Sequence, residues 1–325
     1  MNKMNLMTVL LACLALGACS NDDEQVPQQP EPQPLPEQTY PLTIEVTENP
    51  MTVDGEESSS SSRAAITTNS TLNEFSMSYV YNTSETGIVT ATKDEVDGKW
   101  KDKYEDGWPI SAGADGMVNW YAYTGGTFNL NGGTPYINFT VDENAATQKD
   151  LLVATASGTY SGTGGKLSFS FDHACAALRF YVKKAKNLDG HTLSVSSIVL
   201  KNVIKQAKYY YGTGWGDLYT DRSVYTLYSG SAQTLGSTDY IAMDGGTPSY
   251  LFLIPQTLTP WDHTTAIASA TTQSYLEVTC SINGGGSQTA YIPFGATFAK
   301  GKKYDVKINI GKNSLYSGPN TKVIP

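Results

Sequence analysis

Three histidines are the residues in this sequence most able to perform acid–base or metal chemistry: His173, His191 and His263. Two of them follow an aspartate directly, in Asp172-His173 and Asp262-His263, and a histidine beside a carboxylate is part of many hydrolytic sites. The sequence contains neither a GxSxG elbow nor an HExxH motif, and none of the three histidines has the further partners, at ligand spacing, that a zinc site needs. We therefore predict no enzyme and no catalytic residue, and interpret His173 as a polar side chain beside a bend between strands.

Two glycine-containing stretches partly match binding motifs. SGTGGKLS (161–168) is similar to a P-loop, but position 160, where that motif has its first glycine, is tyrosine. DEVDGKWKDKYEDGW (94–108) is rich in carboxylates, yet the alternate spacing of an EF-hand loop fails at Tyr104. We predict a turn at the first stretch, an exposed loop or hairpin at the second, and no metal or cofactor; a weak surface Ca²⁺ site is the alternative for the second.

A run of aromatic residues around glycines, YYYGTGWGDLY (209–219), could bind sugars. Exposed aromatic faces stack on sugar rings, so four residues are candidate glycan contacts: Tyr209, Tyr210, Tyr211 and Trp215. The alternative, which we favour, is that these side chains belong to a hairpin packed against the rest of the sheet structure.

Two of the four cysteines, Cys175 and Cys280, remain for the folded part of the chain. Cys280 is in phase with Leu276 and Val278, and Cys175 is in phase with Phe171, so both should point inward. We expect two separate buried thiols; one disulfide in an oxidising compartment is the alternative.

The amino-terminal residues predict secretion and lipid attachment. The apolar segment at about 6–16 is far shorter than the roughly 20 residues that a membrane-spanning helix needs, and small residues follow it, as in a secretory signal. LGAC (16–19) resembles the bacterial lipobox, in which the cysteine is linked to diacylglycerol and acylated. We predict a signal peptide at 1–18 and lipid attachment at Cys19; an ordinary secretory signal with an incidental cysteine is the alternative.

Residues 19–39 form a predicted tether. Most of residues 25–41 are Pro, Gln or Glu, a composition that cannot build a core and favours extended chain. The acidic run at 22–24 resembles the signal that sends some Gram-negative lipoproteins to the cell exterior; a solvated charge run is the alternative.

The charge balance argues against a nucleic-acid partner. The chain has 22 basic and 31 acidic residues, a net charge of −9; loss of residues 1–18 removes only Lys3, which leaves 21 against 31, or −10. Phosphate backbones are bound by clustered Lys and Arg, and this chain has the opposite excess.

Alternation of apolar and polar residues, without any sustained 3.6-residue period, predicts an all-β protein of sandwiches or barrels. The first such stretch, TYPLTIEVT (39–47), places Tyr40, Leu42, Ile44 and Val46 on one face. Further strands are predicted at 72–82, 115–124, 192–202, 249–256, 275–283, 289–295 and 304–311, and within 158–171 a Gly/Ser turn leads into another strand that contains Leu167, Phe169 and Phe171.

The phase of the alternation changes once in a long apolar region. Leu167, Phe169 and Phe171 share one phase, whereas Leu178 begins the other, so a bulge or turn must lie between Asp172 and Leu178. The Gly/Ser turn that precedes this region leads us to place a domain boundary near Gly164, which gives two predicted domains, at 40–163 and 164–325.

Several stretches together resemble one family, the fimbrillins, which are lipoprotein pilins of anaerobic Gram-negative bacteria of the Bacteroidales type. The resemblance includes an Arg-Ala start before a strand, a Trp-Pro segment, Asp-Leu-Leu and Phe-x-His runs, and a closing strand, at 61–81, 108–124, 148–182 and 298–313. It implies two tandem β-sandwich domains of transthyretin-like, Greek-key topology.

The resemblance also implies an assembly mechanism. Subunits are exported as acylated precursors, a protease cuts after an arginine, and the groove left by the first strand accepts a strand from the next subunit. Here the candidate bond joins Arg63 to Ala64, after five serines, in a polar stretch suited to proteolysis. Cleavage would release the first strand, 40–53; a surface arginine in an uncut loop is the alternative.

The carboxyl-terminal residues depart from the pattern of a stalk subunit. KNSLYSGPNTKVIP (312–325) contains Gly318-Pro319, and proline cannot donate to a strand ladder. We therefore predict a tip, anchor or accessory subunit that accepts a strand and donates weakly.

Our leading hypothesis is a non-enzymatic surface lipoprotein of the outer membrane that forms part of a fimbrium and contributes to adhesion. Its predicted partners are other fimbrillin-like subunits, the outer membrane through the lipid, and host or bacterial surface glycans or proteins, with no nucleic acid. The alternative is a glycan-binding surface lipoprotein that does not polymerise.

Overall fold

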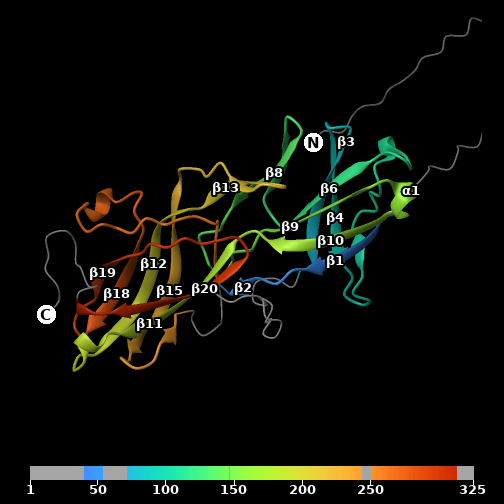
Figure 1. The fold of residues 1–325 in the computed structure, drawn as a ribbon. Helices are drawn as coiled ribbons and strands as arrows, with labels where there is room; N and C mark the ends of the chain where they lie inside the picture. Colours follow the sequence, from blue (N-terminus) through green and yellow to red (C-terminus); the bar gives the residue numbers. More distant parts are fainter. Residues whose placement is uncertain (1–39, 54–71, 146, 244–249, 313–325) are drawn as a thin grey trace, which may run out of the picture. The chain divides into compact units, whose positions relative to one another are not determined.

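The computed structural model describes residues 40–53, 72–145, 147–243 and 250–312, which are built largely from β-strands (Figure 1). The helical elements in these ranges are short: α1 (Tyr160–Thr163), η1 (Ile110–Ala112), η2 (Lys186–Leu188) and η3 (Ile267–Ser269). The prediction of an all-β protein is therefore confirmed.

Seven strands form a closed barrel, in the order β1-β10-β9-β6-β3-β4-β5. Neighbouring barrel strands are antiparallel, except that β1 runs parallel to β10. The predicted tandem sandwiches are not confirmed, because the short strand β5 bridges β4 and β1 and closes this sheet on itself. The strands are β1 (Thr43–Glu48), β3 (Glu74–Tyr81), β4 (Glu85–Lys93), β5 (Trp100–Asp102), β6 (Val118–Tyr123), β9 (Leu152–Gly158) and β10 (Lys166–His173).

The barrel has its own apolar core, because alternate side chains of each strand point inward. Met77, Trp120 and Phe169, from three different strands, are all fully buried there. The inward rings contact one another, as with Phe75 and Phe171, whose centroids lie 5.0 Å apart.

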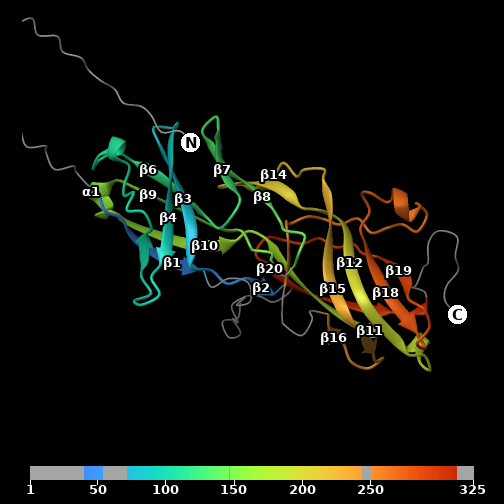
Figure 2. The ribbon, with the colours of Figure 1, turned by 180° about the vertical axis from the view of Figure 1, so that it is seen from behind.

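Three further sheets pack around a second core (Figure 2). The first has the order β16-β11-β20-β2 with β17 also paired to β11, the second β15-β12-β18-β19, and the third β14-β13-β8-β7. Their strands are β2 (Thr52–Val53), β7 (Thr127–Asn131), β8 (Thr134–Thr140), β11 (Ala176–Lys184), β12 (Leu193–Ile204), β13 (Gln206–Tyr210), β14 (Gly214–Gly216), β15 (Arg222–Leu235), β16 (Ile241–Ala242), β17 (Leu251–Leu253), β18 (Tyr275–Ile282), β19 (Gln288–Pro293) and β20 (Lys302–Ile310).

The predicted change of phase marks the place where the chain leaves the barrel. β10 ends at His173, Cys175 forms a bend, and β11 begins at Ala176 in a different sheet, so the turn predicted between Asp172 and Leu178 is confirmed. Gly164 caps α1 between β9 and β10, and the division into domains at that residue stays a prediction.

Candidate functional site

Strand β1 is attached to the barrel mainly along one edge. It pairs with β10 over six consecutive residue pairs, from Thr43 with Lys166 to Glu48 with Phe171. Its other edge pairs with β5 at a single position, Ile44 with Trp100. One nearly complete parallel ladder therefore holds the strand, while its second edge contributes little backbone pairing.

The start of β1 requires a close approach of two backbones. The Thr43 amide donates to the Gly165 carbonyl oxygen at 2.9 Å. Gly165 has a φ of +75°, and a Cβ there would lie 2.4 Å from the Pro41 carbonyl oxygen. Glycine at this position thus allows β1 to enter the barrel beside β10.

The inward face of β1 is apolar, as the alternation predicted. Ile44 is buried, and three half-buried side chains of the same phase, Tyr40, Leu42 and Val46, pack against the barrel core. Complete burial of such side chains stabilises by about 1.5–3 kcal/mol each, so this partly buried set contributes on the order of 5 kcal/mol. These contacts hold β1 against the barrel core.

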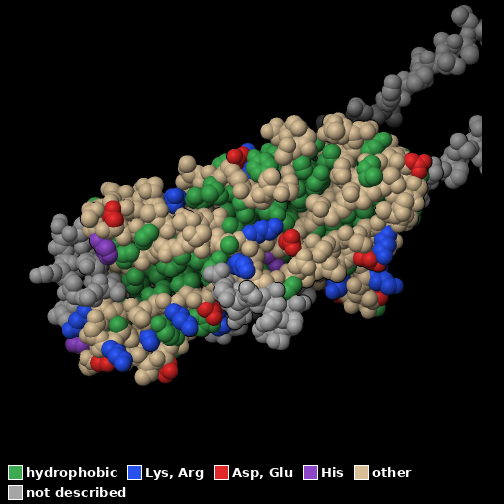
Figure 3. All heavy atoms as spheres, viewed as in Figure 1, with side chains coloured by type: hydrophobic (Ala, Val, Ile, Leu, Met, Phe, Trp, Pro, Cys, Tyr) green, Lys and Arg blue, Asp and Glu red, His purple; other side chains and the backbone are tan. Residues whose placement is uncertain are grey.

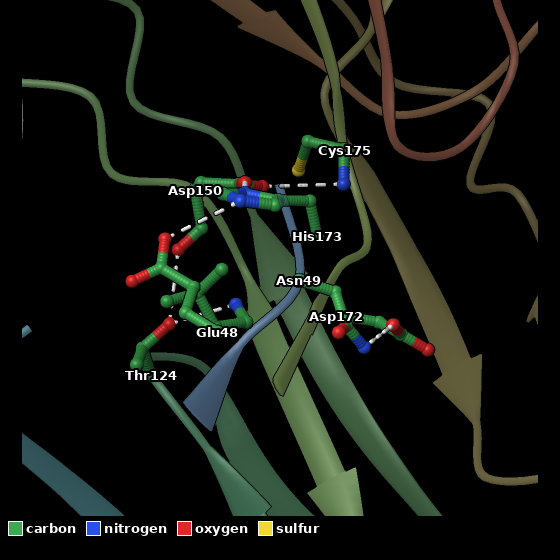
Figure 4. A network of polar contacts seen from close by, with 8 residues as sticks. Glu48, Asn49, Thr124, Asp150, Asp172, His173 and Cys175 are labelled. Atoms are coloured by element: carbon green, nitrogen blue, oxygen red, sulfur yellow. Dashed lines mark hydrogen bonds and ion pairs between the residues drawn. The ribbon is translucent and has the colours of Figure 1, made fainter. Parts of the chain in front are cut away.

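The inward face ends at three charged side chains that we call the His173 cluster, in which Asp150 and His173 are buried and Glu48 is partly exposed (Figure 4). His173 Nδ1 hydrogen-bonds to Asp150 Oδ2, and His173 Nε2 lies 3.3 Å from Glu48 Oε1. Only 8% of the histidine side chain is exposed, compared with 39% of Glu48. The histidine therefore sits between a fixed barrel carboxylate and one that belongs to β1.

The cluster holds its histidine charged. Burial alone disfavours the imidazolium, but the hydrogen bonds to Asp150 and Glu48 outweigh this effect and raise the pKa of His173 to about 9. Asp150 Oδ1 also accepts the Cys175 amide at 3.2 Å. The cluster thereby joins β1 to the point where the chain leaves the barrel.

The outward face of β1 carries polar contacts. Glu45 Oε1 lies 2.7 Å from Lys166 Nζ, and Asn49 Nδ2 donates to Asp172 Oδ1 at 2.8 Å. Because these groups are largely exposed, each contact contributes little to stability.

Past β1 the chain joins the second core. Met51 is buried in that core, and Thr52 and Val53 pair with Lys302 and Lys303 of β20, again in parallel. Beyond Lys303, the described residues offer β20 a partner only on its β11 side. Alternate side chains of β20, Tyr304, Val306 and Ile308, are half-buried against the second core. Apolar side chains are visible at the surface near β20 (Figure 3).

The predicted processing sites lie outside the described residues. Cys19 precedes residue 40, and Arg63 and Ala64 fall between Val53 and Leu72. Their modification and cleavage stay predictions.

The four predicted glycan contacts lie in the β13–β14 hairpin but do not share one exposed face. Tyr209 is buried, Tyr211 donates its hydroxyl to the Ala122 carbonyl oxygen at 3.0 Å, and the Trp215 indole donates to the Ala174 carbonyl oxygen at 2.6 Å. Tyr210 hydrogen-bonds to Asp217 at 2.6 Å. These contacts agree with a packed hairpin, and glycan contact stays a prediction.

Two of these tyrosines nevertheless border a groove, which we call the β9–β10 groove. Strands β9 and β10 are hydrogen-bonded only at Asp172 with Val153 and at His173 with Leu152. A cavity of about 580 Å³ lies beside them, with Lys300 close to the Tyr209 hydroxyl, at 2.9 Å. It is lined mainly by residues 153–155 of β9, residues 168, 170 and 172 of β10, Tyr209, Tyr211, residues 212–214 and Lys300.

The remaining candidate residues serve local packing. Cys175 and Cys280 are buried free thiols, which confirms the expectation of two separate cysteines, and burial raises the pKa of both. His191 Nδ1 pairs with the Asn283 amide at 3.0 Å, and the His263 ring packs on Trp261. Within the described ranges, no group of three His, Cys, Asp or Glu side chains could hold a metal ion.

Sequence reasoning singled out His173 but missed its partners. Glu48 shares the phase of the apolar residues before it. A carboxylate at an inward position needs a partner, and this was the signal in the sequence that could have indicated a buried ion pair. Asp150 belongs to the Asp-Leu-Leu run and His173 to the Phe-x-His run, and the structure shows that the two runs meet through these side chains.

No helix among the described residues is both long and apolar enough to cross a lipid bilayer.

Comparison with known proteins places the chain in a family. A fimbrillin-like family profile matches residues 50–323. A fimbrial protein of Bacteroides vulgatus has a similar fold, with a TM-score of 0.54 and 16% identity over 87% of this chain and 97% of that one. A candidate cell adhesion protein of Bacteroides ovatus aligns with a TM-score of 0.48 and 14% identity, over 88% and 97% of the two chains. No curated protein sequence matches. The extent of the profile match, most of the chain, shows that this protein belongs to the fimbrillin-like family.

Proposed function

We propose that the chain is a non-enzymatic subunit of a surface fimbrium that accepts a strand from a neighbouring subunit in place of β1 and contributes to adhesion. The observation that carries this proposal is the attachment of β1, which fills an apolar position in the barrel yet is paired over its length on one edge only.

The position of Arg63 fits removal of this strand. It follows β1 and β2 in the chain and precedes the other barrel strands, so one cut would separate both strands from everything after residue 63. Loss of residues 40–53 would uncover the edge of β10 in the barrel and residues 302–303 of β20 in the second core. An incoming extended segment could pair with both edges.

The remaining features belong to the same proposal. Two tandem domains, a lipid on Cys19 and retention at the outer membrane fit an exported precursor of a fimbrillin-like subunit. The carboxyl-terminal residues 312–325, with Gly318-Pro319, suit a tip, anchor or accessory position, since they would donate poorly to a ladder.

Limited proteolysis of the full-length chain tests the proposal. The other two arginines, Arg179 and Arg222, are half-buried in strands β11 and β15, so an arginine-specific protease should cut the native protein after Arg63. We expect one cut, release of the β1 fragment only when a competing strand peptide is present, and no cut in Arg63→Ala. Arg222→Lys is the matched control. A cut chain that keeps its fragment against any competitor would contradict strand replacement.

The β9–β10 groove supports a second candidate function, glycan binding. It combines two tyrosines with hydroxyl and charged side chains, a mixture that suits a sugar. Binding of the uncut monomer to a polysaccharide, lost in Tyr209→Ala and kept in Tyr210→Ala, would favour this function. Equal retention by both variants would remove the groove from consideration.

A further inference from the structure

The three side chains of the His173 cluster come from both sides of the proposed cleavage site. Asp150 and His173 stay with the barrel, whereas Glu48 belongs to β1 and would leave with it. Figure 4 shows the histidine ring between the two carboxylates. A strand that replaces β1 therefore packs against a buried histidine. The Nδ1 atom of this histidine is bonded to Asp150, and its Nε2 atom has lost Glu48 as its acceptor.

The position of Glu48 on its strand is set by alternation. Side chains two residues apart point to the same face, so Glu48 follows Ile44 and Val46 on the inward side. A strand in this position presents apolar side chains to the core first and then a carboxylate to the histidine. The pattern is apolar, any residue, apolar, any residue, carboxylate.

A replacing strand without that carboxylate would cover His173 Nε2, a charged donor, and would offer it no acceptor. Unpaired buried donors are costly, and charged ones more so, while a hydrogen bond to a charged group is among the stronger ones. The outward contacts of Glu45 and Asn49 carry less weight, because exposed pairs contribute little. Selection at the inward face thus depends on His173.

We propose that His173 selects the strand that occupies the β1 position: the incoming segment must place an Asp or Glu opposite Nε2, two residues after its last inward apolar side chain. This inference rests on the proposed function, in which another subunit supplies that segment. The occupant is an extended, alternating apolar strand with one inward carboxylate.

The chain's own carboxyl-terminal segment does not meet this requirement. Residues 312–325 contain neither Asp nor Glu. A second copy of this chain would therefore be a poor donor, and the occupant should be a different subunit.

The contact itself is tested in the intact full-length chain by following the titration of the His173 imidazole by NMR. Glu48→Ala should lower its apparent pKa by about one unit or more, because an opposite charge at hydrogen-bond distance is lost. Thr47→Ala, on the outward face, is the matched control and should leave the titration unchanged. An unchanged titration in Glu48→Ala would overturn the proposal whether or not strands exchange.

Selection is tested with the chain cut after Arg63 and synthetic peptides that compete for the β1 position. The peptide of residues 39–53 and its Thr47→Ala version should bind equally, whereas the Glu48→Ala version and the peptide of residues 312–325 should bind at least about tenfold more weakly. In a His173→Gln chain the difference between the first and third peptides should fall to about twofold or less. Equal binding of the Glu48→Ala peptide to the unmodified chain would overturn selection by His173.

A result in which no peptide enters the cut chain has a different meaning. Strand replacement, and with it the proposed function, would then fail, and selection would fail as its consequence. The NMR titration would still show whether the contact between Glu48 and His173 exists, so the two failures are distinguishable.

Discussion

Strands β1 and β3 contribute to the same barrel core but are held in it very differently. β3 pairs with β4 over eight residue pairs and with β6 over five, so both of its edges are joined to antiparallel neighbours. β1 has six pairs on one edge, in parallel, and one on the other. Removal of β3 would break two antiparallel ladders, whereas the exchange of β1 that we propose would break one parallel ladder and a single further pair.

The largest effect on stability is expected when a buried side chain of β3, the strand paired on both edges, is shortened. Met77 of β3 is fully buried, and Met77→Ala should lower the free energy of unfolding by about 3–4 kcal/mol, since it leaves a cavity that a doubly paired strand cannot close. Urea unfolding of the full-length chain measures the change, with Ser76→Ala, on the other face, as control. After the cut at Arg63 this variant should release the β1 fragment no faster than the unmodified chain. Faster release would break the contrast between the two strands.

A similar truncation in β1 should cost somewhat less and act on release. Ile44 is almost fully buried, and Ile44→Ala should lower the free energy of unfolding by about 2–3 kcal/mol, less than Met77→Ala because a strand with one ladder can shift to fill the space. In the cut chain, fragment release into competitor peptide should accelerate by an order of magnitude or more. The exposed Thr43 supplies the control, Thr43→Ala. Unchanged release in Ile44→Ala would show that core packing does not retain β1.

The pH dependence of stability sharpens the contrast at the polar end of β1. The pKa of His173 is raised from 6.5 to about 9 in the folded chain. Protonated His173 therefore stabilises the fold fully below pH 6.5, and this contribution to the free energy of unfolding is lost as the pH rises to 9. We expect stability to fall by on the order of 2 kcal/mol over this range, with water access reducing the full shift. His173→Gln should remove most of the slope, and His191→Gln should keep it. An identical slope in His173→Gln would assign the effect elsewhere.

The smallest effect is expected on the outward face of β1. Glu45 and Lys166 are both about half exposed, so Glu45→Ala should change unfolding and fragment release within measurement error. Glu48→Ala in the same assays is the comparison. If Glu45→Ala were the more disruptive of the two, the outward face rather than the His173 cluster would hold the strand.

Local alternation predicted much of the fold. The inward phase of residues 40–46, the strands later found as β3, β6, β10, β12, β18 and β20, and the bend before β11 all follow from the spacing of apolar side chains. β4, β7, β8, β9 and β15 were not predicted. Residues 229–234 of β15 are exposed on both faces, so this part of the strand lacks the alternation that marks a half-buried strand.

Long-range pairing was beyond the reach of local patterns. The parallel ladders of β1 with β10 and of β11 with β20 join residues more than a hundred positions apart, and no local signal states which edge meets which. The closed barrel follows from a three-residue strand, β5, and so could not be distinguished from a sandwich. Three segments likewise contribute to the His173 cluster, and only its histidine drew notice in the sequence.

Trp100 gives the barrel its own optical reporter. Its position in β5 lies opposite Ile44, at the one place where the free edge of β1 touches a neighbour, and its ring is 5.0 Å from that of Phe75. Departure of β1 would expose this half-buried indole further and move its share of the emission to longer wavelength, against the contribution of the buried Trp108 and Trp120. The presence or absence of a strand at the β1 position could then be followed in real time by intrinsic fluorescence, without any dye.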